Sequence, residues 1–178
     1  MRVRLVPFII GIVIATMLTL TACGSGNAPG TIPTKTAVPA TPTPTIPHVG
    51  QSADQLLAGL KAKGLPIGVT VTYTAETDQN KLLGRPNQYT SKVNFKDTRI
   101  PDSGNQGVDI SVGDGGSIEA FANQADAQKR FQYLQSISSS SSLFAEYEYL
   151  DGVAILRLSH QLTPDQAKAY EVAFKSLP

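Results

Sequence analysis

Few residues of this chain could act as a catalytic nucleophile or base. It has two histidines, His48 and His160, and a single cysteine, Cys23. No serine lies in a Gly-x-Ser-x-Gly turn, which would expose a serine nucleophile between a strand and a helix. A Ser-His-Asp site would therefore depend on His160, because His48 lies in a Pro-rich segment. We expect the protein not to be an enzyme, with a hydrolase that uses His160 and a nearby acid as the catalytic alternative.

Acidic residues gather in a Gly-rich stretch and raise the question of a metal site. Asp102, Asp109, Asp114 and Glu119 lie within 18 residues of one another. An EF-hand loop needs oxygen ligands at alternate positions and a glutamate at the twelfth, and this spacing does not provide them. Asp114 suits a turn, while Asp109 and Glu119 suit the solvent-facing side of strands. We expect no metal ion at these residues.

Two further patterns give weak support for chemistry. Glu146 and Glu148 could form a carboxylate pair, but both share a strand face with Arg157, which favours surface ion pairing over a tuned acid and base. The turn at 113–116 lacks the lysine and the following helix that a phosphate-binding loop needs. We therefore expect no cofactor.

A loop rich in recognition residues is the candidate binding site. The sequence KLLGRPNQY places Arg85, Asn87 and Tyr89 in a segment stiffened by proline and punctuated by glycine. Arginine and tyrosine are enriched among residues that dominate binding energy. The alternative is an ordinary connection in which Leu82 and Leu83 fill the core.

The N-terminal residues have the organisation of a secretory signal. Arg2 and Arg4 form a short positive segment, and a mostly apolar run follows from Leu5 to Leu20. About 16 residues are fewer than the roughly 20 that span a bilayer, but they suit the apolar core of a signal peptide. The sequence LTAC then ends at Cys23.

This arrangement resembles the lipobox of bacterial lipoproteins, and the chain as a whole resembles uncharacterised small surface lipoproteins of bacteria. The resemblance implies that a peptidase cuts between Ala22 and Cys23 and that the Cys23 thiol carries a diacylglyceryl group. Two acyl chains anchor a protein firmly, because each buried CH₂ contributes about 0.8 kcal/mol. A retained helical anchor that ends in an incidental cysteine is the alternative.

The lipobox also implies a location. The protein would be extracytoplasmic and attached to the cell membrane through its lipid. In a two-membrane cell it could reach the outer membrane, because Gly24 stands where an aspartate commonly retains lipoproteins in the inner membrane.

Residues 23–49 are predicted to form a flexible tether after a cleaved signal peptide of residues 1–22. Residues 24–49 hold six of the 12 prolines, six threonines, no aromatic residue and one charge, Lys35. Such a segment cannot bury enough apolar surface to offset the entropy lost on ordering. At about 3.1 Å per residue in polyproline geometry it reaches roughly 80 Å at most. We interpret it as a spacer, with an O-glycosylated stalk as the alternative.

Residues 50–178 are long enough for a single domain. Capping residues mark three helix starts at Ser52, Asn123 and Thr163, of which the first and last have a glutamine three residues later. Each start is followed by an apolar stripe at helical spacing. The stripes are Leu56, Leu57 and Leu60; Ala127, Phe131 and Leu134; and Ala167, Tyr170, Ala173, Phe174 and Leu177.

Alternating apolar and polar residues predict the strands. They fall at 67–74, 89–96, 108–112, 117–121, 146–150 and 153–158. The turn at 113–116 would join the third and fourth strands in a hairpin. Asp151-Gly152 would form a two-residue type I′ turn in a second hairpin, pairing Tyr149 with Ala154 and setting Glu146 across from Arg157 as an ion pair.

These elements predict an α+β fold, with an antiparallel sheet of about five to six strands and about three helices packed on one face. The other face would be solvated and would offer a second candidate interaction surface. Its side chains would be Thr70, Thr72, Lys92, Lys96, Asp109, Glu119, Glu146 and Arg157.

Charge excludes a nucleic-acid partner. The net charge is +1, and the part beyond residue 50 holds all 14 acidic residues with 12 of the 15 Lys and Arg residues. We therefore expect a lipid-anchored, non-enzymatic interaction module at the cell envelope, with the membrane and an envelope or secreted protein as partners. An inhibitor or sensor of a secreted enzyme or ligand is the alternative within the binding class.

Overall fold

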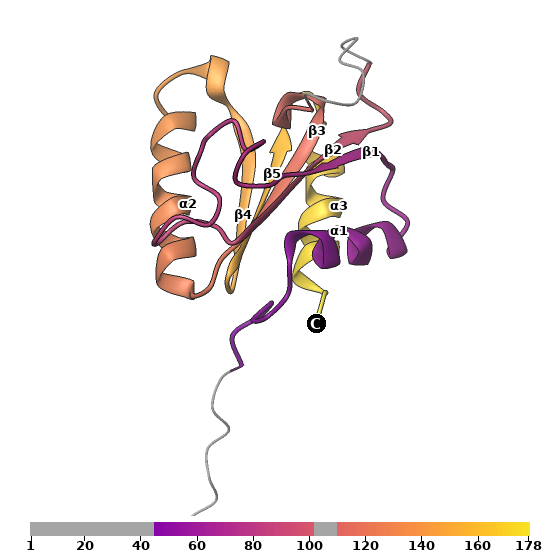
Figure 1. The fold of residues 1–178 in the computed structure, drawn as a ribbon. Helices are drawn as coiled ribbons and strands as arrows, with labels where there is room; N and C mark the ends of the chain where they lie inside the picture. The colour runs from indigo at the N-terminus through magenta and orange to yellow at the C-terminus, as the bar shows by residue number, and fades with distance from the viewer. Residues whose placement is uncertain (1–44, 102–109) are drawn as a thin grey trace, which may run out of the picture. The chain divides into compact units, whose positions relative to one another are not determined.

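The part of the chain that the structure describes contains three α-helices, and each start carries a side-chain cap, as the sequence predicts. In the computed structural model, which describes residues 45–101 and 110–178, they are α1 (Ala53–Ala62), α2 (Gln124–Ser138) and α3 (Pro164–Lys175) (Figure 1). The hydroxyls of Ser52 and Thr163 each accept from the backbone N–H three residues on. The glutamine at that position accepts from the N–H of the cap in return, so two otherwise unpaired donors are satisfied at each start.

Five antiparallel strands form one sheet in the order β1-β2-β3-β5-β4. The class is α+β, and five strands agree with the predicted number. The strands are β1 (Ile67–Thr72), β2 (Ser91–Asp97), β3 (Gly115–Ala120), β4 (Glu146–Asp151) and β5 (Ala154–Ser159). Short 3₁₀ turns at Val112–Asp114 (η1) and Ser142–Phe144 (η2) precede β3 and β4.

The helices lie on both faces of the sheet, so the expectation that all three pack on one face is wrong. Figure 1 shows α1 and α3 on one side and α2 on the other. Alternate residues of β5 divide accordingly. Leu156 and Leu158 join the core beneath α1 and α3, whereas Ile155 joins a second core beneath α2. Each face of the sheet therefore has its own helical cover.

The predicted hairpin between 108–112 and 117–121 is wrong. β3 pairs with β2 along one edge and with β5 along the other, which leaves no edge for another strand. The glycines expected to form the turn begin β3 instead. Gly116 pairs with Phe95, and a Cβ at Gly116 would overlap the Phe95 ring, so the phenyl group occupies the space that glycine leaves open. Val108 and Asp109 lie outside the described residues.

The second hairpin, β4–β5, is present with a shifted register. Tyr149 pairs with Leu156 instead of Ala154, because Asp151 still belongs to β4 and Gly152 and Val153 form the connection. The shift is two residues, so the side chains keep their predicted faces. Arg157 now pairs with Glu148, yet it reaches diagonally to Glu146 with two hydrogen bonds of 2.8 and 2.9 Å. The predicted ion pair is therefore confirmed.

The domain begins before residue 50, contrary to the predicted end of the tether at residue 49. His48 is buried, stacks on Phe174 with ring centroids 5.0 Å apart, and lies 3.1 Å from the Asp151 carboxylate. The carbonyl of Pro47 accepts a hydrogen bond from the N–H of Val153. These contacts bind residues 47 and 48 to the end of the domain that also holds the C-terminus (Figure 1).

Cys23, Ala22 and most of the predicted tether lie outside the described residues. Within residues 45–101 and 110–178, no helix is long and apolar enough to cross a membrane.

Candidate functional site: a groove between the 73–90 loop and α2

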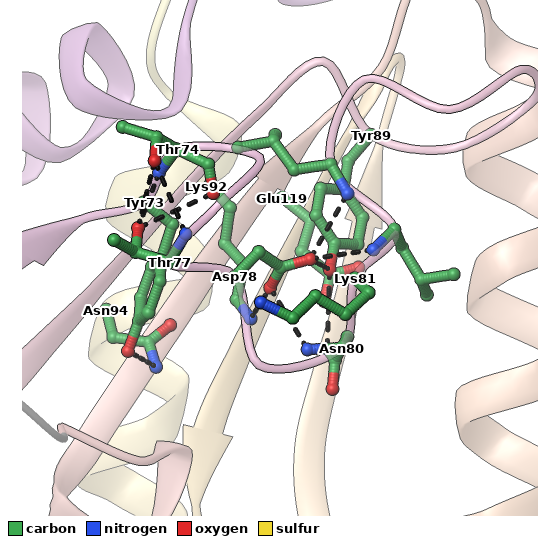
Figure 2. Close-up of polar contacts among 12 residues, drawn as sticks. Tyr73, Thr74, Thr77, Asp78, Asn80, Lys81, Tyr89, Lys92, Asn94 and Glu119 are labelled. Atoms are coloured by element: carbon green, nitrogen blue, oxygen red, sulfur yellow. Dashed lines mark hydrogen bonds and ion pairs between the residues drawn. The ribbon is translucent and has the colours of Figure 1, made fainter.

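The connection from β1 to β2, here called the 73–90 loop, is organised around the buried carboxylate of Asp78. Oδ2 accepts hydrogen bonds from the N–H groups of Leu82 and Leu83, at 2.9 and 3.1 Å, and from the Tyr89 hydroxyl at 2.7 Å. Oδ1 accepts from Nζ of Lys92 at 2.9 Å. Figure 2 shows Tyr89 and Lys92 directed at Asp78. One side chain thus fixes both ends of the KLLGRPNQY segment.

The charge of Asp78 is maintained by this environment. Burial opposes ionisation, but the hydrogen bonds from Tyr89 and Lys92 outweigh it and hold the pKa of the Asp78 carboxyl well below its ordinary value. Burial and the bond to Asp78 raise the pKa of the Tyr89 phenol, so that hydroxyl stays protonated and donates. Nζ of Lys92 lies 4.6 Å from the centre of the Tyr73 ring, which adds a cation–π contact.

The three predicted binding residues divide between the surface and the core. Arg85 and Asn87 are exposed, as expected of residues that contact a partner. Tyr89 is fully buried, packs edge-on against Phe121 and bonds to Asp78, so it supports the loop and does not present a binding surface. Asn87 has a φ of 62°, a left-handed conformation that asparagine tolerates better than most residues.

The sheet face predicted to be solvated is covered by α2 and the 73–90 loop, and two of its predicted charges, Lys92 and Glu119, are buried in ion pairs. Glu119 is fully buried and accepts two hydrogen bonds from Arg130 of α2, at 2.9 and 3.0 Å, and one from Arg157 at 3.2 Å. Burial opposes its ionisation, but both guanidinium groups keep the pKa of the Glu119 carboxyl below its ordinary value. Lys92 is buried on the same face. Neither Lys92 nor Glu119 is therefore available as an exposed interaction residue.

A groove of about 580 Å³ separates the 73–90 loop from α2. Its volume lies within the usual range of small-ligand sites. Polar groups come from both sides, and apolar side chains form the remaining wall. The lining residues are Asn80, Leu82, Asn87, Gln88, Lys129, Arg130, Tyr133, Leu134, Ile137 and Arg157. The loop predicted to bind a partner therefore forms one wall of a groove, although of its three predicted residues only Asn87 lines it.

The signal that could have located the second wall is Arg130. It lies three residues after Ala127 and four before Leu134, in the middle of the apolar stripe of α2. A buried arginine needs a buried acid, because an uncompensated charge in the core is strongly unfavourable. Arg130 therefore indicates that α2 packs against a buried acid, which in the structure is Glu119.

The other sequence candidates are not brought together. His160 is exposed and makes no hydrogen bond to the described residues. Asp114 accepts from the N–H and hydroxyl of Ser111, both at 2.8 Å, within the 3₁₀ turn η1 and not in the hairpin turn predicted at 113–116. Among residues 45–101 and 110–178, no cluster of three or more His, Cys, Asp or Glu side chains could hold a metal ion. Asp102 and Asp109 lie outside that range.

Comparison with known proteins adds no family to this description. The sequence matches no protein-family model, and neither the curated proteins nor the solved structures contain a significant match.

Proposed function

We propose that the protein is a lipid-anchored, extracytoplasmic binding protein without catalytic activity, and that the groove between the 73–90 loop and α2 is its binding site. The lipobox sequence ending at Cys23 supports the anchor, and the Pro/Thr-rich segment supports a domain that reaches away from the membrane. The groove carries the binding part of the proposal, because several polar side chains on its walls have no partner among residues 45–101 and 110–178.

The unengaged groups lie on both walls. The side-chain amides of Asn87 and Gln88 make no hydrogen bond to the described residues, and Lys129 makes no ion pair with them. The aromatic ring of Tyr133 in α2 is also accessible to a ligand, since this residue is 56% exposed. Such groups can form hydrogen bonds and a ring contact with a ligand without breaking contacts inside the protein.

The loop is also preorganised for binding. Asp78 fixes the positions of Leu82, Leu83 and Tyr89, and the N–H of Gly84 donates to the carbonyl of Tyr89 at 2.9 Å, which closes the turn that contains Arg85 and Asn87. A segment that is ordered before binding loses less conformational entropy when a partner arrives. This preorganisation supports the binding part of the proposal, while Leu82 and Leu83 pack against the second core, as the alternative of an ordinary connection expects.

The partner is proposed to be a molecule of the cell envelope or a secreted protein. An inhibitor or sensor of a secreted enzyme is the alternative, and the exposed Arg85 on the same loop would serve it. A hydrolase based on His160 has less support, since that side chain has no carboxylate partner among the described residues.

In-cell photocrosslinking tests the proposal. A photoreactive residue placed at Gln88 faces the groove, whereas one at Val172, which is 60% exposed on α3, reports the opposite side of the sheet. We expect an adduct from position 88 and none from position 172. The adduct should be lost when Cys23→Ser removes the lipidation site, if anchoring brings the domain to its partner. Adducts from position 172 alone would overturn the proposed site.

A further inference from the structure

We infer that the groove binds a ligand with a single carboxylate, held by Lys129 and Arg130; this rests on the proposed function of the groove as a binding site. None of its ten lining residues is acidic, and three are cationic: Lys129, Arg130 and Arg157. The walls therefore offer positive charge to a ligand and no opposing negative charge at the surface.

The three cationic side chains differ in how many of their N–H donors are not used in hydrogen bonds to the described residues. Arg157 uses Nε, Nη1 and Nη2 on Glu146 and Glu119. Arg130 uses Nε and Nη2 on Glu119, and its Nη1 makes no hydrogen bond to the described residues. Lys129 is exposed and makes no ion pair with those residues. Two cationic donors, Nη1 of Arg130 and Nζ of Lys129, thus remain for the two oxygens of one carboxylate.

The balance of charge favours a carboxylate over a phosphate. Glu119 and Glu146 compensate Arg130 and Arg157, since each carboxylate pairs directly with one or both guanidinium groups. Lys129 then contributes the one uncompensated positive charge of the lining. A carboxylate matches that charge, whereas a phosphate monoester carries about −1.5 to −2 at neutral pH.

The remaining walls indicate the body of the ligand. The amides of Asn87 and Gln88 can donate to and accept from hydroxyl or peptide groups. Tyr133 provides a ring surface, continued by the apolar Leu134 and Ile137. A carboxylate on a body with hydrogen-bonding groups and an apolar face is the chemistry shared by a sugar acid and by the C-terminus of a short peptide.

Ligand-detected NMR on the full-length protein in mild detergent tests the inference with two matched pairs. The first pair is glucuronate and glucose, and the second is N-acetyl-glycyl-alanine and its C-terminal amide. We expect the acid of at least one pair to bind about tenfold more tightly than its neutral counterpart, as expected for charge-assisted hydrogen bonds. The pair that shows this preference identifies the source of the carboxylate.

Two variants separate a specific site from general attraction. Lys129→Gln should weaken binding of that acid about tenfold, whereas Lys61→Gln, which removes an exposed charge from α1, should leave it unchanged. The inference of a carboxylate ligand would be overturned by any of three results. These are equal binding of the acid and neutral forms, equal effects of the two variants, or no binding by either acid. The proposed function would still stand if the photoreactive residue at Gln88 captured a partner, and would fall separately if it did not.

Discussion

Replacing Asp78 with asparagine should unfold the 73–90 loop at a predictable free-energy cost. Asp78 is fully buried and compensates Lys92, whose side chain is only 6% exposed. Asparagine keeps the size of the side chain but removes the charge, so the ammonium group of Lys92 would remain buried without a counter-ion. Breaking a buried pair from one side costs about 3–5 kcal/mol. We expect Asp78→Asn to lower the free energy of unfolding by that amount.

A double variant isolates the buried charge as the cause. Lys92→Met in the Asp78→Asn background removes the uncompensated ammonium and keeps an apolar chain of similar length, so it should recover part of the loss. Asp165→Asn is the matched control, because Asp165 is exposed in the first turn of α3, where a carboxylate contributes about 0.3–1 kcal/mol.

Urea unfolding followed by circular dichroism gives the free energy of unfolding of the original protein and of the three variants. The reasoning is refuted if Asp78→Asn costs no more than Asp165→Asn, or if adding Lys92→Met increases the loss. Either result would mean that water reaches this pair and that the loop does not depend on it.

Three further predictions concern pH, packing and the anchor. The pKa of Asp78 is lowered from 3.8 in the folded protein, so the unfolded chain binds a proton first as the pH falls below about 4. The free energy of unfolding should therefore be smaller at about pH 3 than at about pH 6, and the difference should be smaller in Asp78→Asn. Gly152→Ala should destabilise the fold by more than about 1 kcal/mol, because its φ is 52° and a Cβ would overlap the Pro47 carbonyl; Gly50→Ala, also at positive φ but with no atom within 4 Å, should cost less in a thermal-melting comparison. Cys23→Ser should move the protein out of the membrane fraction and remove the lipid mass from its N-terminal peptide, and an unchanged membrane fraction would favour the retained helical anchor.

Local signals predicted the helices and most strands correctly. The caps at Ser52 and Thr163 act over three residues, so neither depends on the rest of the fold. The alternation in β5 likewise gave the correct faces, since the side-chain period of a strand survives a two-residue shift of register.

The errors arose where long-range packing decides the outcome. The alternation of residues correctly placed Glu119 on the face of the sheet opposite Val93 and Phe95. It could not show whether that polar face is exposed to solvent or covered by a helix whose charges pair with it, as Arg130 does with Glu119. A strand over 89–96 would place Tyr89 on the same face as Val93, because the two are four residues apart. However, β2 begins only at Ser91, and the preceding chain turns Tyr89 into the other core. Neither outcome is encoded within a few residues.

The groove proposed as the binding site could be predicted only in part for the same reason. The KLLGRPNQY segment identified one wall from its composition. The other wall lies on α2, more than 40 residues further along the chain, and only the tertiary structure brings Lys129 and Tyr133 to the same groove as Asn87.

A blocking substitution tests the central claim, that the groove is the binding site, most directly. Gln88→Trp should fill the groove, and Val172→Trp should add the same side chain to the exposed face of α3 as a control. Both full-length variants would be compared with the original protein by chemical crosslinking in cells and recovery of the adducts, after circular dichroism has shown that both remain folded. We predict that Gln88→Trp loses the crosslinked partner while Val172→Trp retains it. Recovery of the same partner with both variants would contradict the account.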